Sequence, residues 1–152
     1  MSRLEFTMNL PASPEKLLQM ATDYEKLPTY LPLQLNDVRV IEKRGDETVT
    51  EETLTFKTLI KNNIKQKSKH VVLNNKIITE IIDGPAKGTK MESTYDKYED
   101  GTKISIVVDL KLSLKAKFLQ PIIKKLYKTI LTSVLYKMNT VIMQENADER
   151  TN

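Results

Sequence analysis

The segment from Thr102 to Leu114 constrains the fold most strongly, because apolar and polar residues alternate along it almost without a break. Only Val107 departs from the pattern. Side chains on a strand point alternately to its two faces, so this segment predicts a strand with one wet and one covered face, as in an antiparallel sheet. The apolar parity consists of Ile104, Ile106, Val108, Leu110, Leu112 and Leu114.

The end of the chain supplies an element that could cover this face. Pro121 is a suitable first-turn residue, and apolar residues then recur at three- and four-residue steps as far as Ile142. This spacing predicts an amphipathic helix of roughly 25 residues, about 37 Å long. Further apolar residues widen its stripe, which indicates that the helix lies in a deep groove. The polar tail from Asn146 to Asn152 is expected to fray.

The N-terminal part is predicted to contain one strand and two short helices. Residues 3–10 alternate as a half-buried strand does, and Pro11 ends it. Ser13 before Pro14 has the form of a helix cap followed by a first-turn proline. Further on, Pro28 and Pro32 allow only a short helical turn.

Between residues 36 and 114 the chain is predicted to form successive strands joined by turns at residues 44–47, 74–76 and 99–102. The whole order predicts an α+β helix-grip fold. In this fold a curved antiparallel sheet of about seven strands surrounds a long C-terminal helix, and two short helices follow the first strand. Residues 1–146 are predicted to form one domain, and residues 147–152 a polar tail.

Composition removes several classes of function. The 152-residue chain has no cysteine, which excludes disulfides, thiolate metal sites and cysteine nucleophiles. Its single histidine, His70, excludes a pair of histidine ligands, so we expect neither a metal nor a cofactor. No apolar run is long enough for a membrane span, and the N-terminus does not resemble a signal peptide, so a cytoplasmic protein is expected.

Several motifs, in order along nearly the whole chain, resemble the SRPBCC (START-like) superfamily. They are Pro11-Ala12-Ser13-Pro14-Glu15, residues 23–32 (DYEKLPTYLP), Leu54-Thr55-Phe56-Lys57, Asp83-Gly84-Pro85, and residues 101–104 (GTKI) leading to Asp109-Leu110. Within the superfamily the chain most resembles the polyketide cyclase and coenzyme Q-binding branch, which also contains ribosome-association toxins. The resemblance implies that a hydrophobic or amphipathic molecule is bound between sheet and helix.

The chain also departs from the quinone-binding pattern. That branch usually has a tryptophan in the strand after a Gly-Pro-Phe segment, but this chain contains no tryptophan. Ser93 stands at the corresponding position, Tyr95 occupies the neighbouring aromatic position, and Ala86 replaces the phenylalanine. We therefore expect a pocket that is wider or differently shaped from that of a quinone-binding relative.

Three residues are candidates for chemistry. Glu52 shares its parity with Leu54 and Phe56, so it is expected to point inward, where desolvation would raise its pKa. The alternative is a splayed strand end that lets Glu52 reach water. His70 lies where a bulge is plausible, which leaves its direction open. Tyr95 offers a hydroxyl to a ligand or simply packs in the core. The predicted cavity residues are Leu54, Phe56, Ile77, Ile81, Met91, Ser93, Tyr95, Ile106, Val108, Leu110, Ile130 and Val134.

Three functions remain open. The first is a carrier or sensor of a small hydrophobic, lipid-like molecule such as an isoprenoid quinone. The second is an enzyme of the polyketide cyclase or aromatase kind, which an inward Glu52 paired with a hydroxyl would favour. The third is a ribosome-associated factor. The basic runs at residues 61–69 and 111–128 are expected to be a solvated face, with weak contact to an anionic membrane or RNA as the alternative.

Overall fold

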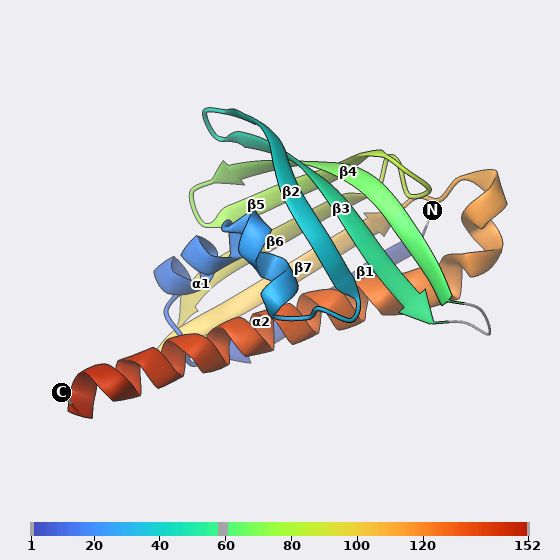
Figure 1. Cartoon of the computed structure of the whole chain (residues 1–152). Coiled ribbons are helices and arrows are strands. Elements are labelled where there is room, and N and C mark those ends of the chain that lie inside the picture. Colours follow the sequence, from blue (N-terminus) through green and yellow to red (C-terminus); the bar gives the residue numbers. More distant parts are fainter. Residues whose placement is uncertain (1, 58–60, 152) are drawn as a thin grey trace.

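The computed structural model describes residues 2–57 and 61–151. The elements, shown in Figure 1, are β1 (Ser2–Leu10), α1 (Pro14–Ala21), the 3-10 helix η1 (Tyr24–Thr29), β2 (Leu35–Arg44), β3 (Glu47–Lys57), β4 (Lys61–Leu73), β5 (Lys76–Asp83), β6 (Lys90–Tyr98), β7 (Gly101–Leu110), the 3-10 helix η2 (Leu114–Leu119) and α2 (Gln120–Thr151).

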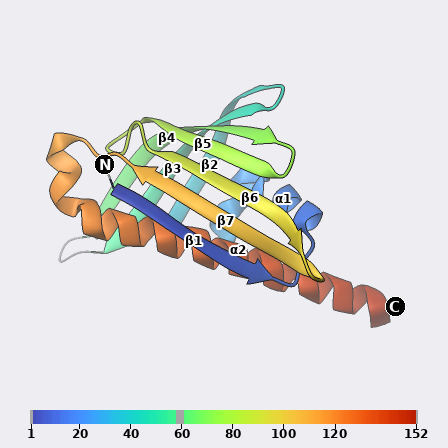
Figure 2. The ribbon, with the colours of Figure 1, turned by 180° about the vertical axis from the view of Figure 1, so that it is seen from behind.

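The seven strands form one curved antiparallel sheet in the order β1-β7-β6-β5-β4-β3-β2. Helix α2 runs across its inner face, as Figures 1 and 2 show from opposite sides. This is the helix-grip α+β fold, and it confirms the predicted fold class. The three predicted turns also join consecutive strands where expected, at residues 44–47, 74–76 and 99–102.

The first short helix begins as the sequence predicts. The Ser13 side chain caps α1 by accepting from the Lys16 N–H group at 3.4 Å, and Pro14 follows it. Proline 28 lies inside η1, the short turn of helix expected there. Tyr24, the first residue of η1, is buried.

The last strand ends earlier than its alternation predicts. Strand β7 stops at Leu110, and the Ser113 N–H group donates to the Pro85 carbonyl outside the sheet ladder. Leu112 is still buried, but Leu114 belongs to η2 and is 84% exposed. The prediction of an inward Leu114 was therefore wrong, because parity carries no information once the backbone leaves the sheet.

Helix α2 is longer than predicted, with 32 residues and thus a length of about 48 Å. Its helical geometry continues through the expected polar tail to Thr151, and this part projects beyond the sheet (Figures 1 and 2). The tail contains glutamate, alanine and arginine, which favour helix. The expected fraying was therefore wrong, because the polarity of this segment indicates exposure to water and not loss of helix.

The core lies between the inner face of the sheet and α2. Its strand side includes Ile104 and Ile106, and its helix side includes Ile123, Met138 and Ile142, all at most 1% exposed. No helix in the described part of the chain is long and apolar enough to cross a membrane.

Gly84 and Gly88 lie in the turn that connects β5 to β6. Gly84 has a φ of +113°, and a β-carbon there would lie 2.7 Å from the Lys65 carbonyl oxygen. Glycine is required at this position because the neighbouring strand leaves no room for a side chain.

Candidate functional site

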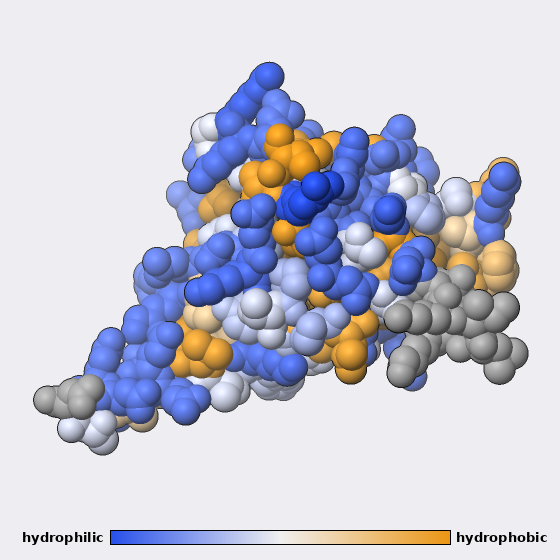
Figure 3. Space-filling model, in the orientation of Figure 1, coloured by the Kyte–Doolittle hydropathy of each residue, from blue (hydrophilic) through white to orange (hydrophobic). Residues whose placement is uncertain are grey.

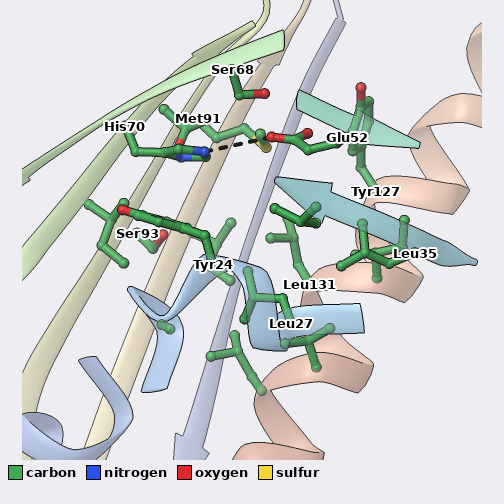
Figure 4. Close-up of a pocket in the computed structure, with 18 of the residues that line it drawn as sticks. Tyr24, Leu27, Leu35, Glu52, Ser68, His70, Met91, Ser93, Tyr127 and Leu131 are labelled. Carbon is green, nitrogen blue, oxygen red and sulfur yellow. Dashed lines mark hydrogen bonds and ion pairs between the residues drawn. The ribbon is translucent and has the colours of Figure 1, made fainter. Parts of the chain in front are cut away.

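A cavity of about 160 Å³ lies between the inner face of the sheet and α2 (Figure 4). Strands β2 to β7 form its walls, and α2 closes one side with Ile130, Leu131 and Val134 among others. Helices α1 and η1 add Ala21, Tyr24 and Leu27. Most of the lining is apolar, and the polar groups come chiefly from β3, β4 and β5.

Most of the residues predicted to face a ligand line this cavity. They are Leu54, Ile77, Met91, Ser93, Tyr95, Ile106, Ile130 and Val134, together with the candidates Glu52 and His70. The side chain of Phe56 lies outside the described residues. Ser93 and Tyr95 thus both face the cavity, whereas Ala86 is buried but does not line it.

Three predicted residues, Ile81, Val108 and Leu110, do not line the cavity and belong to the solid core. Each is at most 2% exposed. They have the inward parity that the sequence predicts. Parity identifies the face of the sheet, but not the places along a strand where sheet and helix leave space between them.

Further residues of the strands, of η1 and of α2 line the cavity, although the sequence did not predict them. They include Tyr24, Leu27, Leu35, Val38, Gln66, Ser68, Thr79, Tyr127, Leu131, Leu135 and Met138. For β4 a signal was present, since Ile64, Gln66, Ser68 and His70 share one parity and are all directed inward or partly buried. The lysines that alternate with these residues lie on the solvent-exposed face of β4. The bulge suggested for this part of β4 was wrong: the register with β5 does shift between Lys67 and Ser68, but the additional residue is Ile82 of β5.

Glu52 points inward and is the centre of a buried polar cluster. Its Oε1 accepts a hydrogen bond from the Thr50 hydroxyl at 2.6 Å, and its Oε2 accepts one from the Gln66 side-chain amide at 2.6 Å. The Tyr127 hydroxyl on α2 donates in turn to Gln66 Oε1 at 3.0 Å. The cluster therefore joins β3, β4 and α2 through side chains alone.

His70 completes the cluster. Its Nε2 lies 3.6 Å from Glu52 Oε1 and 2.8 Å from the Thr50 hydroxyl oxygen, and its Nδ1 lies 2.8 Å from the Thr79 hydroxyl (Figure 4). Since the single Thr50 proton is donated to Glu52, that hydroxyl accepts from His70, and this assigns a proton to Nε2. Both ring nitrogens are thus engaged by protein groups.

The charge state of Glu52 differs from the prediction. Burial alone raises its pKa, as expected, but the contacts with His70, Thr50 and Gln66 together outweigh burial and lower the pKa below its ordinary value of 4.5. The predicted upward shift was wrong because the sequence did not show these donors. Burial and the nearby Glu52 charge raise the pKa of Tyr127, which keeps its hydroxyl protonated and able to donate.

Two hydroxyls in the cavity lack the partners that the cluster has. The Tyr24 ring stacks on His70 with 4.4 Å between ring centroids (Figure 4). Its hydroxyl oxygen and that of Ser68 are buried without a hydrogen-bond partner among the described residues. Burial raises the pKa of Tyr24 to about 12, so this hydroxyl is a neutral donor. An unpaired buried hydroxyl costs about 1–3 kcal/mol, and such groups are uncommon in native proteins.

The arrangement limits the available chemistry. Both oxygens of Glu52 and both nitrogens of His70 have protein partners, so a substrate that approached either residue would compete with these contacts in this conformation. No group of three metal-ligating side chains lies together in residues 2–57 and 61–151. The groups left available to a bound molecule are the apolar walls and partly exposed polar residues such as Ser93, whereas the Tyr24 and Ser68 hydroxyl oxygens are fully buried and become accessible only if the lining shifts.

A curved sheet that encloses a cavity against one long helix defines a helix-grip domain of the SRPBCC superfamily. The chain belongs to the polyketide cyclase/dehydrase and lipid transport family, whose model matches residues 10–139. No curated protein matches the sequence.

Solved structures with the same fold are distant in sequence. The protein TTHA0849 from Thermus thermophilus is 16% identical, with a TM-score of 0.80 over 95% of this chain and 99% of that one. The Zhui aromatase/cyclase from Streptomyces is 11% identical, with a TM-score of 0.76 over 90% and 93%. A START superfamily protein from Mycobacterium smegmatis is 15% identical, with a TM-score of 0.75 over 93% and 97%. At these identities the likeness establishes the fold.

Proposed function

We propose that this protein binds a small hydrophobic molecule, about one ring in size and bearing a polar oxygen, between its sheet and α2. The observation that carries this proposal is an apolar cavity whose lining includes Tyr24 and Ser68, two residues with buried hydroxyls that have no hydrogen-bond partner in the described part of the chain. Apolar walls with a few polar groups that fix orientation are the usual composition of a ligand site.

The cavity volume restricts the ligand. Sites for drug-sized molecules usually enclose about 300–1,000 Å³, whereas an apolar cavity of about 150 Å³ holds a molecule such as benzene. At about 160 Å³ this cavity accommodates one ring. A complete isoprenoid quinone would require sheet and helix to move apart, so a compact ring compound is the better fit.

The protonation state of the Tyr24 hydroxyl restricts the ligand further. The neutral Tyr24 hydroxyl needs an acceptor, and a carbonyl or hydroxyl oxygen on the ligand would supply one. Ser68 can either donate or accept. The ligand proposed here is therefore a ring compound with a carbonyl or phenolic oxygen, and the self-contained Glu52 cluster acts as a rigid wall beside it.

A matched pair of probes tests this proposal. Tyr24→Phe and Ser68→Ala are each expected to weaken binding of acetophenone about three- to tenfold, the equivalent of one hydrogen bond. Binding of isopropylbenzene, which has a similar shape without the oxygen, should not weaken. Titration calorimetry measures both affinities, and Tyr98→Phe, at a half-exposed position outside the cavity, is the control. Equal losses for both probes, or no binding of either, would contradict the proposal.

A proton-transfer enzyme of the cyclase kind is the second candidate. The observation in its favour is the inward Glu52 paired with the Thr50 hydroxyl and with His70. To act as a base, Glu52 would have to be reached by substrate beside its protein partners or after release of one of them. An enolate oxygen formed on the substrate could then accept from Tyr24.

Deuterium exchange separates the two candidates. For a binding protein, the methyl protons of acetophenone are expected to exchange in D₂O no faster than in buffer, as followed by proton NMR. For an enzyme, exchange should accelerate with the wild-type protein and return to the buffer rate with Glu52→Gln. We expect the first result, because Glu52 is buried and its lowered pKa makes the carboxylate a weak base.

A further inference from the structure

Positive charge is concentrated in one segment of the chain. Between Leu110 and Gln144 there are seven lysines and no acidic residue, whereas the whole protein has a net charge of only +4. The rest of the chain is therefore net negative. The lysines are Lys111, Lys115, Lys117, Lys124, Lys125, Lys128 and Lys137, and no salt bridge found among the described residues includes any of them.

The same segment presents large apolar side chains to water. In η2, Leu114 is 84% exposed and Phe118 is 78% exposed, and Ile122 in the first turn of α2 is 37% exposed. All three lie within residues 114–122, so one short stretch of the chain exposes three large apolar side chains. Figure 1 places η2 at one end of the molecule, and Figure 3 shows apolar surface at that end.

The lysines here are unfavourable for the helix itself. Lys124 and Lys125 lie near the N-terminus of α2, the positive end of the helix dipole, and the first turn contains no acidic residue. Lys115 and Lys117 in η2 add to the same positive field. Natural sequences tend to place charges unfavourably for the local structure only at functional sites. The lysines that repel the positive end of the helix dipole would attract an anionic partner.

We propose that η2 and the first two turns of α2 form a docking surface for a membrane that contains anionic phospholipid. Leu114, Phe118 and Ile122 enter the interfacial region, where burial of each side chain is favourable, and the flanking lysines contact lipid phosphates. Near an anionic membrane each lysine contributes about 1 kcal/mol, which makes docking reversible and salt-sensitive. RNA would pair with the lysines but would leave Leu114 and Ile122 in water. This inference does not depend on the identity of the cavity ligand.

Vesicle flotation of the full chain tests the proposal. The wild-type protein is expected to float with vesicles of phosphatidylcholine and phosphatidylglycerol, and to bind vesicles of phosphatidylcholine alone much more weakly. The double variant Leu114→Ser/Phe118→Ser should lower partitioning at least tenfold. Lys115→Gln/Lys117→Gln should lower it about thirtyfold, and only on the anionic vesicles. Higher salt should weaken binding of the wild-type protein.

Controls use equivalent residues elsewhere. Leu33→Ser replaces a leucine that is 75% exposed, and Lys43→Gln an exposed lysine of the β2–β3 hairpin, and both should leave partitioning unchanged. Circular dichroism checks that each variant is folded. The proposal fails if the wild-type protein binds neither vesicle, or if the serine variant floats as well as wild type. It also fails if the serine variant converts a wild-type dimer to a monomer without changing flotation. RNA binding that survives the serine substitutions, without vesicle binding, would assign the surface to nucleic acid.

Discussion

Replacing Glu52 by alanine is expected to lower the free energy of unfolding by about 2–6 kcal/mol, because two buried donors lose their acceptor and each such loss costs about 1–3 kcal/mol. The substitution leaves the Thr50 hydroxyl and the Gln66 amide without their acceptor inside the protein, and it removes the carboxylate that lies 3.6 Å from His70 Nε2. Glu52→Gln keeps the shape and one oxygen, so it should cost less. Urea denaturation monitored by circular dichroism measures both changes.

The neighbouring residue Glu51 provides the control. It lies on the other face of β3, and its carboxylate pairs with Arg39 at 2.6 Å on the surface, where both side chains are well exposed. Glu51→Ala should therefore change stability by at most about 1 kcal/mol. If the two alanine variants lost equal stability, the buried cluster would not be the organising contact described above.

The Glu52 cluster also predicts a pH dependence. Folding lowers the pKa of Glu52, so its ionised form stabilises the fold above the ordinary value of 4.5. This contribution should disappear as the pH falls from about 4.5 through the lowered pKa. In Glu52→Gln the same pH range should show a smaller loss of stability than in wild type. Parallel pH profiles for the two proteins would show that the charge is not what stabilises the cluster.

Ser93→Phe is expected to abolish binding of acetophenone and isopropylbenzene. Ser93 lies on the cavity wall, and a phenyl ring there would occupy the space proposed for the ligand ring. Overpacking should cost about 1–3 kcal/mol of stability, which is tolerable in a folded domain. Titration calorimetry measures binding, and thermal unfolding confirms that the variant is folded.

Thr94→Phe is the matched control, since it adds the same ring at the next residue of β6, which does not line the cavity. This variant should bind both probes as wild type does. Normal binding by a folded Ser93→Phe variant would place the ligand site elsewhere. Loss of binding in both variants would point to a general effect on the sheet.

The fold was predictable because its signals are local and periodic. Alternation in residues 102–110 and helical spacing after Pro121 define two surfaces that can only be buried against each other. The errors fall where periodicity ends: at Leu114, where the chain leaves the sheet, and in residues 146–151, where polarity and helicity coexist.

The site was less predictable for a different reason. Inward parity correctly placed Glu52, but its lowered pKa depends on Gln66 and His70 from β4, which reach it only through strand register. Likewise, the unpaired hydroxyl of Tyr24 depends on how η1 packs against the sheet. Such properties arise from contacts between segments far apart in sequence, and a single chain does not reveal them.

Native mass spectrometry of the protein purified from its own source tests the central claim most directly. The account predicts a one-to-one complex with a compact molecule that carries a ring and an oxygen, released on denaturation and absent from Ser93→Phe. The opposite result would be a wild-type protein that is empty and binds neither acetophenone nor isopropylbenzene. An added mass that persists unchanged in Ser93→Phe would equally contradict a ligand held between sheet and helix.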